Sequence, residues 1–164
     1  MSGRAAILYV GDGFDTSGQK LMGRQAAGEG FLKAWVRYSG ADPVVAWLEQ
    51  ASEEKGFRAS VEALDPGRRT AVAGPANVTA MTQAGALWLP EPRLSRYAWL
   101  RRHGPQNAFS IVGVTHTTAS HAALDGLAEL LVAPVQPWDA VICTSKSVRA
   151  TVETLFALEF EYLS

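Results

Sequence analysis

Residues 109–120 read FSIVGVTHTTAS, and this stretch decides the fold class that we expect. An apolar, β-branched run at 111–114 leads directly into a polar segment at 115–118. Short apolar runs of this kind are typical of strands that are buried on both faces, as in parallel sheets. Ligands of open α/β sheets bind beyond the carboxyl ends of such strands. The stretch therefore predicts an α/β protein with polar groups at a strand tip.

The rest of the chain alternates between the two kinds of element. Strands are predicted at 5–10, 44–48, 70–73, 86–90, 109–116 and 140–145. Helices are predicted at 21–38, 52–64, 78–84, 94–103, 120–132 and from 147 to the end. Alternation of this kind indicates a parallel sheet covered by helices on both faces. We therefore predict a single Rossmann-like domain over residues 1–164, a three-layer α/β/α sandwich with a mostly parallel sheet.

Composition narrows the classes of partner and compartment. The 164 residues carry a net charge of −1, which gives no field that would attract nucleic acid. One cysteine cannot form an internal disulfide, and the simplest interpretation is a reducing, cytoplasmic setting. No apolar run reaches the roughly 18 residues of a spanning helix. No zinc-type motif is present either, so we expect neither a metal site nor a cofactor.

The first candidate site is the glycine-rich segment at 11–18, GDGFDTSG, which follows the first predicted strand. It is predicted to be a loop. Such a loop can present backbone N–H groups to a phosphate, and Gly11, Gly13 and Gly18 are its candidate contacts. Thr16 takes the third glycine position of the dinucleotide fingerprint G-x-G-x-x-G. A structural turn and a phosphate or sugar loop both remain open. Glu49, after the second strand, stands where a ribose-binding acid could lie.

The second candidate site lies at the end of the opening stretch. Thr115, His116 and Thr117 follow the strand, and an imidazole there could bind a ligand hydroxyl or move a proton. The alternative is a histidine whose neighbouring hydroxyls serve the backbone, with Thr118 or Ser120 as the N-cap of the next helix. We expect His116 to face a ligand.

The third candidate site is the end of the last predicted strand. Thr144 and Ser145 could touch a ligand or cap the final helix. Cys143 lies inside an apolar run and is interpreted as a buried small hydrophobe rather than a nucleophile.

A basic cluster interleaved with aromatic residues precedes the opening stretch. It could hold an anionic acceptor or contact a membrane surface, but a solvated helix face is the commoner arrangement. The cluster comprises Arg93, Arg96, Tyr97, Trp99, Arg101, Arg102 and His103.

Three segments together resemble a known family. They are GRQAAGEGFL at 23–32, GVTHT at 113–117 and WDAVICTS at 138–145. On these segments the chain resembles the N-terminal half of a bacterial GT-B glycosyltransferase of the group 1, family 4-like kind. The resemblance covers nearly the whole chain.

The resemblance implies transfer of a sugar from a nucleotide-sugar to an acceptor sugar or lipid, without a metal. In that family the N-terminal domain receives the acceptor and a C-terminal domain holds the donor. Gly13 and Gly18 are then expected near the donor diphosphate, and His116 near the transferred sugar in a catalytic role. The C-terminal donor-binding domain is missing here, so we expect this chain to be incomplete alone. Two E-x7-E pairs, Glu54 with Glu62 and Glu153 with Glu161, are interpreted as chance.

Two other functions remain open at this point. One is a non-catalytic Rossmann-like module that binds a nucleotide or another phosphate ligand. The other is a small hydrolase or reductase built on His116 and Cys143.

Overall fold

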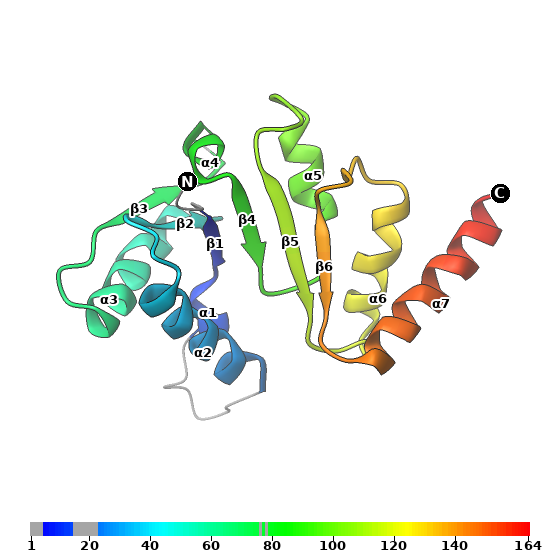
Figure 1. The fold of residues 1–164 in the computed structure, drawn as a ribbon, viewed down its shortest axis with the longest axis horizontal. Helices are drawn as coiled ribbons and strands as arrows, with labels where there is room; N and C mark the ends of the chain where they lie inside the picture. The colour runs from blue at the N-terminus through cyan, green and yellow to red at the C-terminus, as the bar shows by residue number, and fades with distance from the viewer. Residues whose placement is uncertain (1–4, 15–22, 76, 78) are drawn as a thin grey trace. The chain divides into compact units, whose positions relative to one another are not determined.

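The strands belong to one parallel sheet in a computed structural model that describes residues 5–14, 23–75, 77 and 79–164 (Figure 1). Their order is β3-β2-β1-β4-β5-β6, the order of the doubly wound dinucleotide-binding folds. The Rossmann-like α/β prediction is confirmed, and the sheet is parallel throughout. The strands are β1 (Ala6–Tyr9), β2 (Val44–Leu48), β3 (Thr70–Ala73), β4 (Ala86–Leu89), β5 (Ser110–Thr115) and β6 (Ala140–Cys143).

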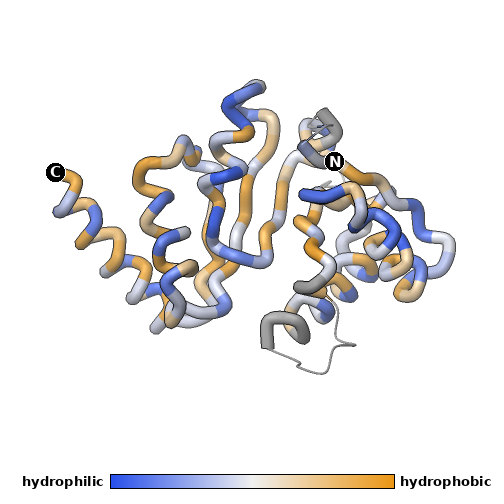
Figure 2. Tube along the Cα trace, turned by 180° about the vertical axis from the view of Figure 1, so that it is seen from behind, coloured by the Kyte–Doolittle hydropathy of each residue, from blue (hydrophilic) through white to orange (hydrophobic). Residues whose placement is uncertain are grey.

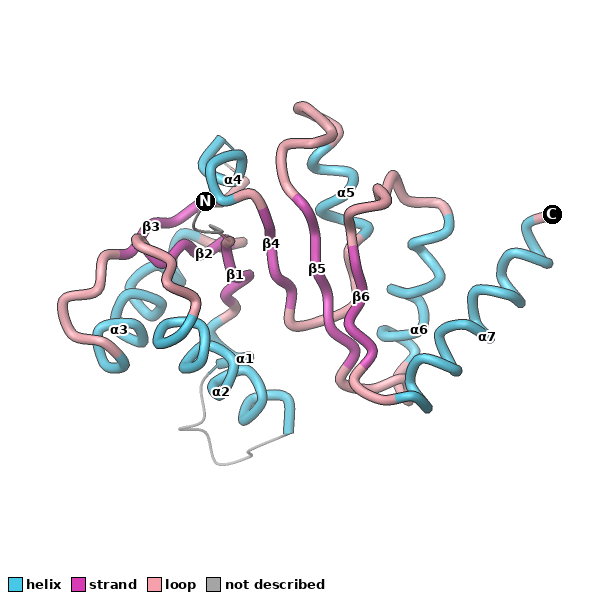
Figure 3. The backbone as a smooth tube through the Cα atoms, viewed as in Figure 1, coloured by secondary structure: helices cyan, strands magenta, loops and turns pink. Residues whose placement is uncertain are grey.

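Helices separate the strands along the chain, as the sequence predicts (Figure 3). They are α1 (Gly11–Phe14), α2 (Gly23–Tyr38), α3 (Glu54–Leu64), α4 (Thr79–Ala84), α5 (Ser95–Arg101), α6 (His121–Ala128) and α7 (Lys146–Leu163). Two single 3₁₀ turns, η1 (Ala51–Glu53) and η2 (Glu129–Leu131), adjoin α3 and α6. The predicted elements are thus present, with ends that differ by a few residues.

The chain divides into two compact parts, residues 1–87 and residues 88–164, and each is described by itself. In the first part, β2 pairs in parallel with both β1 and β3. Every residue of β1 and β2 is buried. The ring of Tyr9 stacks on Phe14 at 5.0 Å between centroids and meets the edge of Phe57 at 5.4 Å. These rings seat α1 and α3 against the end of β1.

The loop expected at 11–18 is partly helical, because α1 begins directly after β1. Phe14 is buried against Tyr9, and one helical turn brings its ring back over the strand end. Burial of an aromatic ring outweighs the low helix propensity of Gly11 and Gly13. Residues 15–18 lie outside the described residues.

In the second part, β5 and β6 pair in parallel, with Thr115 opposite Cys143. A Cβ added at Gly113 would lie 2.6 Å from the carbonyl oxygen of Glu91 and 2.5 Å from Cδ1 of Leu94. A Cβ at Gly126 of α6 would lie 2.2 Å from Cγ of Arg93. Segment 91–94 therefore packs against both β5 and α6, and each contact is possible only because the facing residue is a glycine.

A buried ion pair joins the end of α5 to the starts of β5 and β6. Arg101 and Asp139 form a two-pronged contact, with Nη1–Oδ1 at 2.7 Å and Nη2–Oδ2 at 2.6 Å, and their side chains are 0% and 2% exposed. Arg101 Nη1 also donates to the carbonyl of Phe109. Asp139 accepts the backbone N–H groups of Ile111 and Gln136, both at 2.8 Å. The interpretation of the basic cluster as a solvated face is therefore wrong for Arg101, because this network satisfies its charge in the interior.

Candidate functional site

The carboxyl end of β1 carries a backbone donor that is already occupied. The N–H of Gly11 donates to Oε1 of Glu53 at 3.1 Å. The second oxygen of that carboxylate, Oε2, is buried and has no hydrogen-bond partner. An anion brought to this N–H would meet the negative charge of Glu53. Gly13 lies in the same helical turn, and Gly18 lies outside the described residues.

A cavity of about 330 Å³ lies at the carboxyl ends of β2 and β3. It forms where ligands of Rossmann-like sheets bind, and its volume is in the lower range of small-molecule sites. The chain after β3 turns sharply, with the Asn77 N–H donating to the Gly74 carbonyl at 2.8 Å. A Cβ at Gly74 would lie 2.7 Å from the Leu48 carbonyl oxygen, so glycine is needed there. The lining comprises Leu48, Glu49, Ala51, Glu54, Val72, Ala73, Gly74, Pro75 and Asn77.

Two carboxylates of this cavity are held in place by nitrogen donors. Trp47 Nε1 donates to Oε1 of Glu49 at 3.1 Å. Arg58 donates to Oε1 of Glu54 through Nε at 2.8 Å and Nη2 at 2.7 Å. A carboxylate fixed in this way still has acceptor capacity, which suits a ligand that carries hydroxyl groups. Sequence reasoning noted Glu49 but gave Glu54 no role; its place in the first turn of α3, just after β2, was the available signal.

The hydroxyls at the ends of β5 and β6 bind the backbone. Thr115 is fully buried, and its Oγ1 donates to the carbonyl of Ile142 at 3.1 Å. The Oγ1 of Thr144 donates back to the carbonyl of Thr115 at 2.9 Å. These two bonds fasten the strand ends to each other, so the structure gives both hydroxyls a structural partner.

Beyond Thr115 the chain becomes exposed. His116 and Thr117 lie on the surface, and the Thr117 Oγ1 accepts the N–H of Ala119 at 3.0 Å. Ser120 and Ser145 are the N-caps of α6 and α7, and each hydroxyl accepts a backbone N–H of its helix, at 3.3 and 3.1 Å. The hydroxyls predicted at this edge of the sheet thus bind the backbone, whereas His116 is exposed to solvent just after β5.

The structure brings some of the predicted residues together. Thr115 and Thr144 are in direct contact, and His116 follows next along the chain. Gly11 and Gly13 belong to the first part of the chain, whereas these residues belong to the second. The convergence of the two groups stays a prediction.

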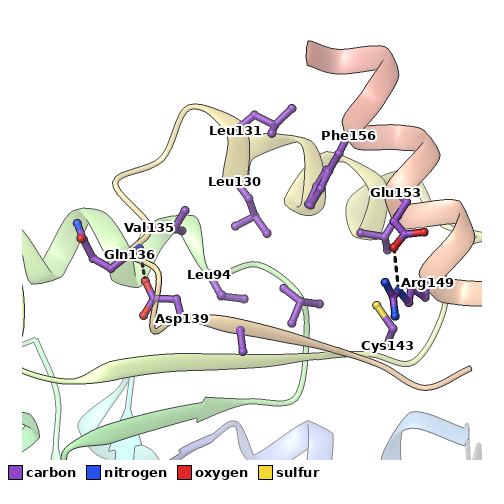
Figure 4. Close-up of a pocket in the computed structure, with 13 residues that line it drawn as sticks. Leu94, Leu130, Leu131, Val135, Gln136, Asp139, Cys143, Arg149, Glu153 and Phe156 are labelled. Carbon is purple, nitrogen blue, oxygen red and sulfur yellow. Dashed lines mark hydrogen bonds and ion pairs between the residues drawn. The ribbon is translucent and has the colours of Figure 1, made fainter. Parts of the chain in front are cut away.

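Cys143 is half-buried rather than buried, so the interpretation of this residue as an enclosed small hydrophobe is corrected. It lines a larger cavity, about 680 Å³, beside β6 (Figure 4). The cause is the loose cover on this face of β6, because α7 buries only Val152 and a cavity lies between the helix and the strand. The other lining residues are Leu94, Leu130, Leu131, Val135, Gln136, Asp139, Ala140, Val141, Arg149, Val152, Glu153 and Phe156.

Among the described residues, no group of three or more His, Cys, Asp or Glu side chains could hold a metal ion. No helix in that part of the chain combines the length and the apolarity that crossing a membrane requires. Comparison with protein-family models, curated proteins and solved structures finds no match for this chain.

Proposed function

We propose that this chain is the acceptor-side, Rossmann-like domain of a GT-B glycosyltransferase. The observation that carries the proposal is the all-parallel sheet in the order β3-β2-β1-β4-β5-β6, with an exposed imidazole directly after β5. This order places the carboxyl ends of the strands along one edge, where ligands of such folds bind. His116 is the group we assign to the acceptor hydroxyl, as a general acid or base.

The backbone N–H of Gly11 limits which ligand group can bind at the end of β1. Its N–H already binds the Glu53 carboxylate, so a phosphate at that atom would have to displace a like charge. A neutral sugar hydroxyl, in contrast, carries no charge that Glu53 would repel, and it can donate to a carboxylate oxygen. The geometry therefore favours a sugar over a diphosphate at the end of β1, and the donor diphosphate is left to a second domain.

The cavity at the ends of β2 and β3 favours one alternative function. A non-catalytic module that binds a nucleotide would place a ribose against Glu49 and its base among Val72, Ala73 and Pro75. The volume of about 330 Å³ is sufficient for a nucleoside-sized group. This alternative makes no use of His116.

Titration of the isotope-labelled chain separates the two functions. The ligands are a simple methyl glycoside, UDP-glucose, GDP-mannose and the corresponding free nucleotides. Changes in the amide NMR chemical shifts of the protein report the binding of each ligand. The acceptor domain predicts shifts at His116 and Thr117 with the glycoside and weak binding of nucleotides. The binding module predicts micromolar nucleotide affinity and shifts at Gly74 and Asn77.

Matched histidine variants make the test specific. His116→Ala should abolish the glycoside-induced shifts, and His103→Ala, which removes an exposed histidine after α5, should leave them unchanged. Unchanged glycoside binding in His116→Ala would contradict the assignment of that residue. Absence of any sugar response in the unmodified chain would contradict the acceptor-domain function itself.

A further inference from the structure

Exposed hydrophobic side chains concentrate at the end of the second part. Seven of the ten large hydrophobic side chains exposed in the described residues lie between positions 132 and 163. Exposed apolar groups gathered in this way mark an interaction surface. They are Val132, Trp138, Ile142, Leu158, Phe160, Tyr162 and Leu163, and Figure 2 shows hydrophobic segments alternating with hydrophilic ones along α7.

Helix α7 is only lightly seated on its own fold. It has 18 residues and packs on α6, η2 and β6, yet Val152 is its one buried residue. The cavity of about 680 Å³ lies beneath it, with Val152 and Phe156 in its lining. Leu158, Phe160 and Leu163 do not line this cavity, so a small molecule that filled it would leave them exposed. The occupant must reach along the helix.

Strand β6 presents a second open element beside α7. It is the last strand in the sheet order, and Ile142 on it is 47% exposed. An edge strand offers a row of backbone N–H and C=O groups to another strand. An occupant that supplies both a strand and an apolar helix would therefore match this surface.

The charges of α7 point to what that occupant is. Lys146 and Arg149 lie near its start, where Arg149 also pairs with Glu153 at 2.8 Å, whereas Glu159 and Glu161 lie near its end. The first turn holds no acidic residue and the last turn no basic one, which is the reverse of what a helix dipole favours. This order is unfavourable for a lone helix. In an antiparallel pair of identical helices, each basic start would face an acidic end.

We propose that two copies of this chain pair through β6 and α7 about a two-fold axis. Strand β6 then lies antiparallel to β6 of the second copy, and the two α7 helices pack antiparallel across the junction. The same surface serves on both copies, which is what a closed two-fold interface requires. An 18-residue helix is about 27 Å long. Stable dimers bury about 800 Å² on each side, so the interface has to extend along the helix and the adjoining strand. This inference is independent of the proposed function.

Sedimentation velocity on the full chain tests the pairing. Over protein concentrations from about 1 to 100 µM, the range in which interfaces of this size begin to form, the mass should rise from 17.6 kDa to twice that value. Ile142→Asp and Leu163→Glu should each keep the chain monomeric. Tyr38→Glu is the matched control, because Tyr38 is 81% exposed in the first part of the chain.

Charge reversal tests the antiparallel arrangement. Lys146→Glu with Arg149→Glu, or Glu159→Lys with Glu161→Lys, should raise the dissociation constant by about tenfold or more. All four substitutions together should restore it. Both double substitutions improve the match of α7 to its dipole. Arg149→Glu also breaks the ion pair with Glu153, so Glu159→Lys with Glu161→Lys is the cleaner test of the pairing.

Three outcomes would overturn the proposal. One is a monomer at every concentration. Another is a dimer that responds neither to Ile142→Asp nor to charge reversal, which would place the interface elsewhere. The third is a series of species larger than the dimer, which indicates a contact that does not close.

Discussion

The pair of Arg101 and Asp139 shows how burial changes the value of a charge. Removal of one member leaves the other charged and without its counter-ion in the interior. We expect Arg101→Met to lower the free energy of unfolding by about 3–5 kcal/mol. Asp139 would keep its bonds from Ile111 and Gln136 but lose both guanidinium contacts. Urea unfolding followed by circular dichroism measures the change.

Arg102→Met is the control for this substitution. Arg102 is exposed, and its guanidinium lies over the ring of Trp99 at 5.5 Å. Its replacement should cost less than about 1 kcal/mol, the range of an exposed cation–π contact. If both variants lose the same free energy of unfolding, the buried ion pair contributes no more to stability than the exposed contact.

An exposed pair in the first part gives a pH-dependent contrast. Arg69 donates to Asp42 through Nε at 3.0 Å and Nη2 at 2.8 Å. These hydrogen bonds, and then the charge of Arg69, lower the pKa of Asp42 in the folded chain. The contact therefore contributes to stability at pH values above the unfolded-state pKa. Its contribution is lost as the pH falls through the lower, folded-state value.

The expected result concerns the titration of Asp42 itself. Arg69→Gln should move the pKa of Asp42 back up toward its ordinary value, as read from the side-chain carboxyl carbon by NMR. Arg149→Gln removes the same charge from the second part, where Arg149 pairs with Glu153, and should leave the Asp42 titration unchanged. If the pKa of Asp42 is the same with and without the Arg69 side chain, the ion pair does not persist in solution.

At the scale of elements, two glycines should respond in opposite ways to alanine. Gly113 in β5 lies against the backbone of Glu91, which cannot move aside without the strand end moving too. Gly113→Ala should therefore destabilise the chain by about 1–3 kcal/mol, as overpacking does. Gly30 lies within α2, where an added Cβ meets nothing within 4 Å. Gly30→Ala should stabilise it by about 0.5–1 kcal/mol.

Thermal or urea unfolding of the two variants gives the comparison directly. The alanine side chain is the same in both, so the difference in sign reports the crowding at Gly113 against the open space and the helix-propensity gain at Gly30. If Gly113→Ala leaves the free energy of unfolding unchanged, segment 91–94 moves away from β5 with no loss of stability.

Sequence patterns predicted the strands well because a strand buried on both faces leaves a continuous apolar run. Every residue of β1 and β2 fits this rule. The helix at Gly11 was missed because contact between Phe14 and Tyr9 decides it, and propensity does not report such contacts. Arg101 was misplaced for the same reason, since its partner Asp139 lies 38 positions away in sequence.

The candidate site was predicted only in part. The polar strand tips were visible in the sequence, but the roles of their hydroxyls were not. Thr115 and Thr144 exchange hydrogen bonds with the backbone of the neighbouring strand, a choice that depends on strand register. The cavity at the ends of β2 and β3 depends on a turn that Gly74 makes possible.

At the scale of the whole molecule, pairing of two copies would couple stability to concentration. A folded state that associates is stabilised by mass action, so the midpoint of thermal unfolding should rise with protein concentration. High salt should reduce the effect, because charges at the ends of α7 are screened. Differential scanning calorimetry over a hundredfold range of concentration measures both. The Leu163→Glu variant should give one midpoint throughout.

Segment 91–94 has a consequence for how this protein can change over generations. The stem of Arg93 lies where a side chain at position 126 would be, so a larger residue there requires that Arg93 rotate away or be shortened. The same holds for Leu94 and position 113, although the carbonyl of Glu91 blocks that second path as well. Mutational routes through this part of the chain are therefore ordered, and position 126 can vary earlier than position 113.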